Sequence, residues 1–469
     1  MKIDLIKTLK YIDKDLELYG WIDVRRDHGK LIFFDLRDRS GKVQLVVTPN
    51  DPDLHKIAET LRPEWVVKIS GKVVKRPDAM KNPDEPTGEI EIKVSKIEVL
   101  TQAKTPPFEL STDGYEIGEE VRMQYRYLDL RRPRLKKNLI ERARVIKFIR
   151  DFLAERDFIE VETPILSKST PEGARDYLVP SRLHQGNFYA LPQSPQQYKQ
   201  LLMVAGIEKY FQIARCFRDE DTRGDRQPEF TQFDLEMSFV QRDDILSLTE
   251  DLYLAIAKKL YPNKKLTLTD DGKIPRMTHK EAMEKYSSDK PDIRKDKNDP
   301  DELAFLFVLD FPAFEWKETE KRWDSTHHPF TKPQVKDTQD FWQKFKSEPG
   351  DMLADQYDFV LNGYEIGGGS IRIHDPELLK AVFEALGNNK EDIEKQFGHM
   401  FEAFSYGVPP HGGIAPGIDR LVMILMNEPN IREVIAFPKT GDGRDLMMRA
   451  PSAVDKKQLD EIGIEIKKK

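Results

Sequence analysis

The segment Cys216–Phe239 constrains the fold of this chain more than any other part of its 469 residues. It reads CFRDEDTRGDRQPEFTQFDLEMSF, in which two apolar-rich stretches flank a connector crowded with Asp, Arg and Gln. This arrangement predicts an antiparallel hairpin with a long polar loop. The mixture of arginines and acids suits a bound nucleoside triphosphate, because guanidinium groups bind phosphate oxygens. The chain contains no GxxxxGK[ST] run and no GxGxxG run after a strand, so a nucleotide would bind on a sheet rather than on a P-loop.

The N-terminal part of the chain is rich in short β-prone stretches. Between Leu16 and about Leu100, five such runs are separated by turn residues, and one helix is expected at Asp51–Arg62, after the third run. Five strands with a helix in that position are typical of an OB barrel. Beyond a linker rich in Pro and polar residues, strands and helices mix without a regular βαβ alternation. That pattern favours a mostly antiparallel sheet packed against helices.

The chain is therefore expected to have an α+β fold with more than one domain. We assign residues 1–104 to an OB-fold domain, 105–135 to a hinge or linker, and 136–469 to a larger second domain. Apolar periodicity predicts helices at 138–156 and 243–260 in the second domain.

Composition excludes several classes of protein. The single cysteine, Cys216, cannot form an internal disulfide, which fits a reducing compartment. A formal net charge of −7 argues against a generally basic nucleic-acid coat but allows a local basic face. The N-terminus lacks the apolar core of a signal peptide, and no run of about 18 apolar residues predicts a membrane span. We expect a cytoplasmic protein without a membrane partner.

Three segments carry a resemblance to a known family. Cys216–Phe239 closely resembles motif 2 of the class II aminoacyl-tRNA synthetases, and RDED followed by DRQPEFTQ resembles their bacterial aspartyl branch, in subclass b. Gly412–Leu425, GGIAPGIDRLVMIL, resembles motif 3, and Glu141–Leu166, which ends in VETPIL, resembles motif 1. The resemblance covers nearly the whole chain. It implies an OB-fold anticodon-binding domain, a class II catalytic domain, and ATP-dependent ligation of L-aspartate to tRNA through aspartyl-adenylate.

The resemblance also implies a homodimer, with motif 1 at the dimer seam and Pro164 ending its strand. ATP and Mg²⁺ would be required, without a tightly bound organic cofactor. Arg218 would grip the α-phosphate, because a guanidinium fork matches two oxygens. Phe230 would lie beneath the adenine, with Arg420 stacked on its other face. The ATP-binding residues implied are Arg218, Asp219, Glu220, Gln227, Phe230, Glu365, Gly417, Ile418, Asp419 and Arg420, of which Arg218, Glu365 and Arg420 would be catalytic.

Two acids in the run YDFVLNGYEIGGGSIR, Asp358 and Glu365, are candidates for binding the metal. On one uninterrupted strand their odd spacing would place them on opposite faces. A bulge or turn at Asn362-Gly363 would bring both to one ion. Hard oxygen ligands beside phosphates imply Mg²⁺.

A pocket for aspartate must pair a second carboxylate, so it needs cations. Lys199 in QSPQQYKQ and Arg372 in GGGSIRIH are the candidates. A site for lysine would need acids instead, and a site for asparagine would need a neutral amide partner, since a buried and uncompensated Lys/Arg pair is costly. The aspartate-binding residues implied by the resemblance and this argument together are Glu172, Gln196, Lys199, Arg218, Asp234, His327 and Arg372. His328 is adjacent, and the sequence does not decide which ring faces the pocket.

The barrel would grip the tRNA anticodon, since OB faces bind single strands by stacking and by hydrogen bonds to splayed bases. The resemblance places Phe33, Gln44 and Glu91 at the anticodon. His28 and Ala79 lie where the family varies with tRNA selectivity, and they resemble the non-discriminating enzymes, which charge both tRNA(Asp) and tRNA(Asn). The alternatives are a discriminating enzyme for tRNA(Asp) only, and a tRNA-binding paralogue with another amino acid or no activity.

The chain departs from the family pattern between motifs 2 and 3, where bacterial aspartyl enzymes usually carry a large extra domain. YSSDKPDIR and FVLDFPAFEW resemble the two flanks of that domain and are separated here only by KDKNDPDELAFL. We therefore assign 273–321 to a reduced insertion region within the catalytic domain.

Overall fold

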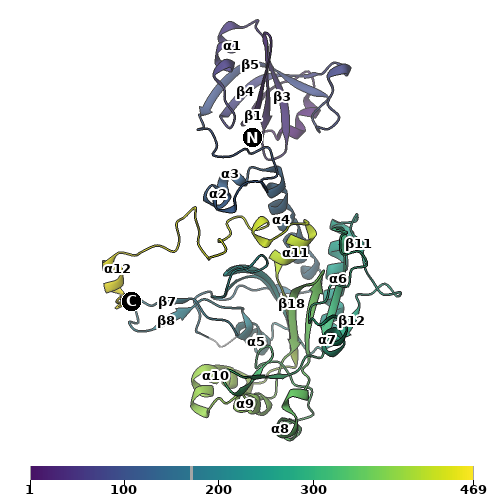
Figure 1. Cartoon of the computed structure of the whole chain (residues 1–469), viewed down its shortest axis with the longest axis vertical. Helices are drawn as coiled ribbons and strands as arrows, with labels where there is room; N and C mark the ends of the chain where they lie inside the picture. Colours follow the sequence, from purple (N-terminus) through teal and green to yellow (C-terminus); the bar gives the residue numbers. More distant parts are fainter. Residues whose placement is uncertain (1, 170–172, 468–469) are drawn as a thin grey trace. The chain divides into compact units, whose positions relative to one another are not determined.

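Figure 1 shows a computed structural model of the protein, which describes residues 2–169 and 173–467. The chain divides into two units, one running to Thr112 and the other beginning at Asp113.

A closed β-barrel forms the first unit, with the strand order β1-β2-β3-β5-β4. Helix α1 (Pro52–Thr60) follows the third strand, and the Asp51 carboxylate caps it by accepting from the Leu54 N–H at 3.0 Å. The parallel pairing of β3 with β5 completes the barrel. This architecture confirms the expected OB fold. The barrel strands are β1 (Asp15–His28), β2 (Leu31–Arg37), β3 (Lys42–Val47), β4 (Val66–Lys75) and β5 (Ile90–Thr101), preceded by the short helix η1 (Leu5–Tyr11) and interrupted by η2 (Asp78–Met80).

An eight-stranded sheet forms the centre of the second unit, in the order β12-β14-β17-β18-β19-β10-β9-β6. Among its described strands only β12–β14 and β6–β9 pair in parallel, which confirms the expected antiparallel character. Strands β9 and β10 are the predicted hairpin around the polar loop. The strands are β6 (Ile159–Glu160), β9 (Lys209–Phe217), β10 (Glu229–Ser238), β12 (Arg276–Thr278), β14 (Phe305–Leu309), β17 (Gln356–Leu361), β18 (Tyr364–Ile371) and β19 (His411–Pro416).

The two faces of this sheet have opposite character, because successive side chains of a strand point to opposite sides. Odd-numbered side chains such as Phe233, Leu235 and Phe359 share one apolar core with three helices, α4 (Pro133–Ala154), α6 (Arg242–Leu260) and α11 (Ile418–Leu425). The even-numbered side chains of β10 lie on the other face and include Gln232, Asp234 and Glu236. The sheet therefore buries an apolar face under helices and keeps a polar face for a site.

The predicted helices of the second unit are present with shifted ends. Helix α6 matches the expected 243–260 to within one residue. Helix α4 begins at Pro133, before the expected 138, because proline is well accommodated in the first turn of a helix. The strand expected to end at Pro164 is shorter than predicted, since β6 ends at Glu160 and pairs with β9 over only two residues.

The other elements surround the sheet. Helices α8 (Thr338–Ser347), α9 (Pro376–Ala385) and α10 (Lys390–Ser405) share a separate apolar core at one end of the unit. The remaining helices are α2 (Glu119–Gln124), α3 (Arg126–Asp129), α5 (Gln196–Val204), α7 (His279–Tyr286), α12 (Lys456–Glu461), η3 (Pro349–Asp351) and η4 (Ile431–Glu433). Three two-stranded sheets pair β7 (Leu178–Pro180) with β8 (Phe188–Ala190), β11 (Lys265–Leu266) with β13 (Glu302–Leu303), and β15 (Phe314–Lys317) with β16 (Arg322–Ser325).

Slightly less than half of the region 273–321 is regular structure. It contains β12, α7, β13, β14 and β15, and its irregular chain between α7 and β13 covers residues 287–301. None of the helices in the described part of the chain has both the length and the apolar character needed to cross a membrane.

Candidate active site

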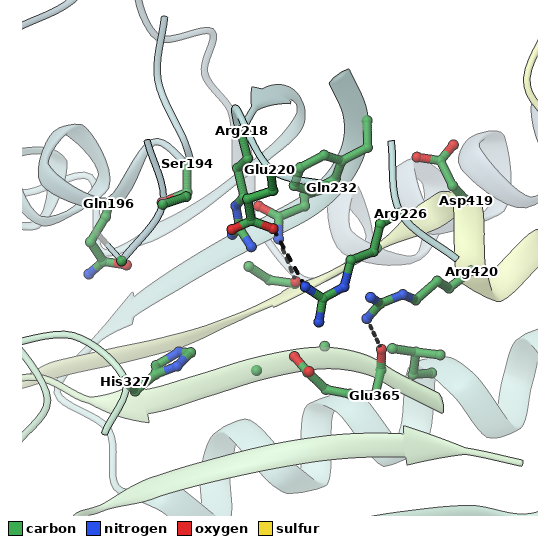
Figure 2. A pocket seen from close by; sticks show the side chains of 18 of the residues that line it. Ser194, Gln196, Arg218, Glu220, Arg226, Gln232, His327, Glu365, Asp419 and Arg420 are labelled. Carbon is green, nitrogen blue, oxygen red and sulfur yellow. Dashed lines mark hydrogen bonds and ion pairs between the residues drawn. The ribbon is translucent and has the colours of Figure 1, made fainter. Parts of the chain in front are cut away.

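A cavity of about 360 Å³ lies on the polar face of the large sheet. That volume falls within the range of ordinary small-molecule pockets. Its walls come from the loop after β9, from β10 and β18, and from the starts of α5 and α11. Arg218, Arg226 and Arg420 converge from one side, and Glu365 and His327 lie across from them (Figure 2). The cavity is lined by these predicted residues: Gln196, Lys199, Arg218, Glu220, Gln227, Phe230, His327, Glu365, Arg372, Gly417, Asp419 and Arg420.

Four other predicted residues are described by the structure and lie outside this lining. Asp219 faces a neighbouring, more open cavity of about 300 Å³, where it lies beside Arg175. The Ile418 side chain is fully buried in the helix-covered core. Asp234 and Asp358 are buried just behind lining residues, as detailed below. Glu172 falls outside the residues that the structure describes.

The polar loop brings its arginines to one end of the cavity. The Arg218 guanidinium lies 5.2 Å from the centre of the Phe230 ring. Its Nε is buried and has no hydrogen-bond partner within residues 2–169 and 173–467. A buried donor of this kind is costly unless a ligand accepts its hydrogen bond. This end of the cavity is therefore suited to an anion.

Arg420 is held in place by the backbone around it. Its Nη1 donates to the Glu365 carbonyl at 2.5 Å, and its Nε donates to the Asp225 carbonyl at 3.1 Å. Its Nη2 also pairs with the Asp225 carboxylate at 3.1 Å. These bonds fix the guanidinium beside the polar loop. Because the guanidinium group is planar, it is suited to stacking on a ring.

Two residues predicted to bind the nucleotide, Gln227 and Asp419, are hydrogen-bonded to other parts of the protein. The Gln227 amide makes two hydrogen bonds with the Lys439 backbone, accepting from its N–H at 2.7 Å and donating to its carbonyl at 3.2 Å. The Asp419 carboxylate accepts from Arg142 Nη1 at 2.5 Å and from the Thr231 N–H at 2.9 Å. Both side chains line the cavity, yet these bonds tie them to the C-terminal segment, to α4 and to β10.

The two predicted cations meet at the other end of the cavity, and two buried acids compensate them. Lys199 Nζ donates to Asp234 Oδ1 at 2.6 Å and lies 3.4 Å from Glu236 Oε2. Arg372 forms a bidentate pair with Glu236, at 2.8 and 3.1 Å. Glu236 therefore contacts both cations. Because all four groups are at most 2% exposed, these are charge-assisted bonds in a dry environment.

Sequence reasoning did not find Glu236. The available signal was the alternation along β10, where Gln232, Asp234 and Glu236 occupy every second position of a strand whose other face is apolar. Gly413 on the neighbouring strand makes room for the carboxylate, because a Cβ there would come within 2.2 Å of Glu236 Oε2. Burial alone would raise the pKa of Glu236, but Arg372 and Lys199 outweigh it and hold that pKa below its usual value.

Both adjacent histidines line the cavity. His328 Nε2 accepts a hydrogen bond from Arg372 Nη1 at 2.9 Å, so this ring supports the arginine. His327 is directed into the cavity (Figure 2). Burial lowers the pKa of His327 to about 4 and that of His328 well below its usual value, so both rings are neutral at pH 7.

The two acids proposed for a metal are brought to one face by the turn of the β17–β18 hairpin. Val360 pairs with Glu365 next to the turn at Asn362-Gly363, and Asp358 lies two positions before Val360 on the same face of β17, in agreement with the expected turn. Asp358 Oδ1 is buried and accepts no hydrogen bond within the described part of the chain. Burial, aided by Glu365, raises the pKa of Asp358 well above its usual value.

An orphaned buried carboxylate beside a second acid fits a hard cation. A Cβ at position 368 would come within 3.2 Å of Asp358 Oδ1, so glycine keeps this approach open. Among the residues that the structure describes, no group of three or more His, Cys, Asp or Glu side chains is arranged to hold a metal ion. These two acids would therefore supply only part of a coordination shell.

The residues predicted to read an anticodon lie together on the outside of the barrel. Phe33 is half-buried on β2, whereas Phe34 points into the barrel core. Gln44 on β3 donates to Glu91 on β5 at 3.1 Å, across neighbouring strands. His28 is exposed at the end of β1, with its ring 5.8 Å from that of Phe33. Ala79 is exposed in η2.

Two family models match the chain. Residues 118–441 match the tRNA synthetases class II (D, K and N), and residues 16–100 match an OB-fold nucleic acid binding domain. The "Aspartate--tRNA(Asp/Asn) ligase" of Rubrobacter xylanophilus is 42% identical over 578 residues, covering 97% of this chain and 95% of the relative. The "Aspartate--tRNA ligase" of Staphylococcus aureus is 40% identical over 585 residues, covering 98% of each. Both alignments are longer than this chain by more than a hundred positions, so the relatives contain stretches without a counterpart here.

Solved structures share the fold at low sequence identity. The asparaginyl-tRNA synthetase from Pyrococcus horikoshii has a TM-score of 0.73 at 24% identity, covering 94% of this chain and 98% of that one. The aspartyl tRNA synthetase from Entamoeba histolytica has a TM-score of 0.71 at 22% identity, covering 93% and 91%.

The contribution of the Glu236 charge to stability can be tested by replacing it. Glu236→Gln should lower the free energy of unfolding at pH 7 by about 3–5 kcal/mol, because it breaks a buried ion pair. The pKa of Glu236 is lowered on folding, so the benefit of its charge is complete above the unfolded pKa of about 4.3 and is lost as the pH falls through the lower folded value. The difference from the wild type, measured by urea unfolding, should therefore narrow as the pH is lowered below about 4.3.

Glu229→Gln on the same strand is the matched control. Its partner Arg215 lies at 2.7 Å, but the glutamate side chain is 34% exposed, so the loss should be at most about 1 kcal/mol. Equal losses for the two variants would contradict the role of the buried network.

Proposed function

Because the chain belongs to the class II tRNA synthetases of the D, K and N family, we propose that it ligates L-aspartate to tRNA at the expense of ATP. The observation that carries this proposal is the pair of buried cations, Lys199 and Arg372, at one end of the cavity. Each is held from behind by a buried acid and presents its remaining donors to the cavity. The curated relatives named above support the same amino acid.

The charge pattern selects against the sister amino acids of this family. The side-chain carboxylate of aspartate would receive charge-assisted bonds from both cations. The side-chain ammonium of lysine would meet the same cations and be repelled. The amide of asparagine carries no charge and can accept at only one atom, so its bonds to the two cations would be weaker than those of the carboxylate.

The reaction runs in two steps at this cavity. The α-carboxylate oxygen of aspartate attacks the α-phosphorus of ATP and pyrophosphate leaves, giving aspartyl-adenylate. A terminal ribose hydroxyl of tRNA then attacks the carbonyl carbon of this mixed anhydride, and AMP leaves. Arg218, with its unpartnered Nε, would bind the α-phosphate over Phe230. Catalysis by these residues consists of positioning and charge neutralisation.

The roles of the residues around these steps are assigned from the part of the cavity that each one lines and from its hydrogen bonds. Lys199, Arg372, Gln196 and His327 line the amino-acid end, and Asp234 acts there by holding Lys199. Asp358 and Glu365 would hold Mg²⁺, with the phosphates supplying further oxygens. When bound, that ion would neutralise phosphate charge. The neutral His328 fixes the orientation of Arg372.

We assign the domains by the same reasoning. Residues 1–104 bind the anticodon, 105–135 form a hinge, and 136–469 carry out catalysis, with 273–321 as a reduced insertion. The enzyme works as a cytoplasmic homodimer.

Phe33, Gln44 and Glu91 offer a stacking ring and hydrogen-bonding groups on neighbouring strands, as single-stranded RNA requires.

Charging of both tRNA(Asp) and tRNA(Asn) is the favoured specificity. His28 lies beside Phe33 on the barrel surface, where its ring could contact a neighbouring nucleotide. The Rubrobacter xylanophilus relative is named for both tRNAs. The second candidate is an enzyme for tRNA(Asp) alone, as the name of the Staphylococcus aureus relative allows.

The choice of amino acid is tested by ATP–pyrophosphate exchange across a panel of amino acids. L-Aspartate should stimulate exchange most strongly, because it alone satisfies both cations. Exchange stimulated best by asparagine or lysine would refute the pocket assignment.

Replacing Lys199 by Met tests the residue on which selectivity depends. Lys199→Met should reduce kcat/KM for aspartate in the exchange assay by on the order of 10⁴-fold, because it leaves Asp234 and the substrate carboxylate facing each other without their cation. Lys147→Met removes an exposed lysine of α4 and should leave the rate unchanged. A loss below about tenfold in a folded Lys199→Met protein would contradict the role of this lysine.

The tRNA specificity is tested with purified tRNAs. Aspartylation of both tRNA(Asp) and tRNA(Asn) is expected, with His28→Gln reducing the charging of tRNA(Asn) more than that of tRNA(Asp). If the wild type aspartylates tRNA(Asp) alone, the discriminating alternative is correct.

A further inference from the structure

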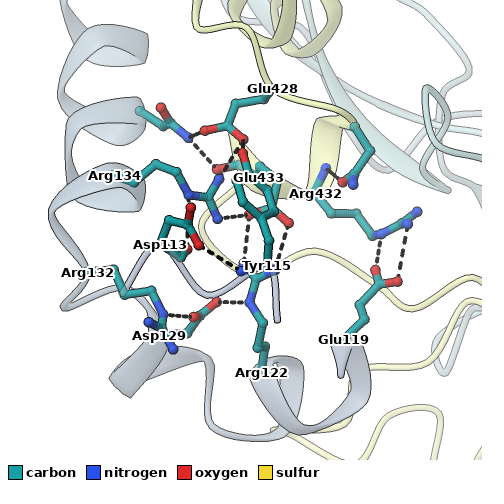
Figure 3. A network of polar contacts seen from close by, with 12 residues as sticks. Asp113, Tyr115, Glu119, Arg122, Asp129, Arg132, Arg134, Glu428, Arg432 and Glu433 are labelled. Carbon is teal, nitrogen blue, oxygen red and sulfur yellow. Dashed lines mark hydrogen bonds and ion pairs between the residues drawn. The ribbon is translucent and has the colours of Figure 1, made fainter. Parts of the chain in front are cut away.

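A buried network of charges joins the beginning of the second unit to a short helix beside the cavity (Figure 3). Arg122 of α2 donates two hydrogen bonds to the Glu433 carboxylate, at 3.1 and 2.7 Å, and a third to Asp129 at 3.0 Å. Arg134 donates to Glu433 at 2.8 Å and to Glu428 at 2.5 Å. Arg122 and Glu433 are each only 5% exposed. These residues are separated by about three hundred positions in the sequence and meet only in the folded protein.

Further bonds tie the same two segments together. Arg126 of α3 donates to the carbonyls of Arg432, Ile435 and Ala436 at 2.7 to 3.0 Å. Asn138 donates to Glu428 at 2.6 Å, and the Tyr115 hydroxyl donates to the same carboxylate at 2.8 Å. Segment 113–138 therefore holds residues 428–436 through many charge-assisted bonds, which are stronger than neutral ones.

The short helix in that second segment, η4, continues into the cavity wall. Ile431 lines the cavity, and its N–H donates to the Gly224 carbonyl at 2.9 Å. Arg432 Nη1 donates to the Arg223 carbonyl at 3.3 Å, and its guanidinium also pairs with Glu119 of α2. Gly224 and Arg223 lie in the polar loop between β9 and β10. That loop carries Arg218, Glu220, Asp225, Arg226 and Gln227, all of which line the cavity.

We propose that Glu433 and Arg122 are positioning residues for nucleotide binding. Their ion pair holds η4 against the polar loop, and η4 in turn sets the place of the loop arginines that receive the phosphates. Neither residue lines the cavity, so they act through Ile431 and Arg432. The inference rests on the proposed function only in taking the ligand of the loop to be ATP.

The chemistry of Glu433 supports a role that depends on its charge. Burial would raise its pKa, but Arg122 and Arg134 outweigh that effect and keep the pKa below its usual value. The ionised carboxylate accepts bonds from two guanidinium forks, whereas a glutamine amide can accept at one atom only. Glu433→Gln keeps the size of the side chain and removes this geometry. It therefore loosens η4 with little change of packing.

The experiment measures nucleotide and aspartate separately. The dissociation constant of an ATP analogue with a methylene group between the α- and β-phosphates is measured by calorimetry, and KM values for ATP and aspartate come from pyrophosphate exchange. Glu433→Gln should weaken analogue binding and raise the KM for ATP by about tenfold. The reason is that a small displacement of the loop arginines misaligns their contacts with the phosphates, although Glu433 itself lies outside the cavity. The KM for aspartate should change by less than about twofold, since Lys199 and Arg372 are not attached to this network.

Further variants of Arg432 and Arg122 locate the effect. Arg432→Met removes the bond to the Arg223 carbonyl at a less buried position and should raise the KM for ATP in the same direction. In a double-mutant cycle, Arg122→Met combined with Glu433→Gln should lose less than the sum of the two single effects, because both variants break the ion pair that these residues share. Arg122→Lys keeps the charge without the fork and should fall between Arg122→Met and the wild type.

Glu302→Gln is the matched control. Glu302 is also buried, accepts from the Lys295 and Asp296 N–H groups, and has a lowered pKa, but it lies in β13 outside the cavity wall. It should leave both KM values unchanged. Should Glu433→Gln fail to fold, Arg432→Met decides the question.

Unchanged analogue binding in the folded variants overturns the proposal, as does an aspartate KM that rises in step with the KM for ATP. The two proposals fail separately. A wild type that binds the analogue but shows no aspartate-dependent exchange refutes the proposed function, while the analogue measurements still decide the role of Glu433.

Discussion

The buried balance of two cations and two acids at the end of the cavity is the interaction on which the rest of the site depends. Lys199 and Arg372 are buried, and their ion pairs with Asp234 and Glu236 offset the cost of removing these charges from water. Both cations also line the cavity, where a ligand can reach them. The same ion pairs that stabilise these buried charges would therefore also position them for the proposed carboxylate ligand.

The large sheet makes this balance possible by separating its two faces. Odd-numbered residues of β10 and β17 pack under α4, α6 and α11, while Gln232, Asp234 and Glu236 point to the other side. Glycines of β18 and β19 remove side chains where acids need room, as Gly413 does for Glu236 and Gly368 does for Asp358. Polar groups are therefore buried at the site without disturbing the apolar core on the opposite face.

Several parts of the fold could be predicted from the sequence because their signals are local. The β9–β10 hairpin, helix α6 and the five-stranded barrel follow from periodicity and turn residues within short windows. Other features depend on register. Asp358 and Glu365 share a face because the turn at Asn362-Gly363 pairs Val360 with Glu365, and β6 is shorter than the run around Pro164 suggested. Local patterns do not specify these details, because one residue of shift reverses a strand face.

The amino-acid sequence by itself determined which chemical groups this protein has available: arginines in one polar loop, the cations Lys199 and Arg372, the acids Asp358 and Glu365, and an aromatic ring on a barrel strand. The tertiary structure alone decided how these groups are held. It paired Glu236 with both cations, tied Gln227 to the backbone of Lys439, and joined Arg122 to Glu433. Such partners are distant in sequence, and the energy of a buried charge depends on which groups surround it rather than on its neighbours along the chain.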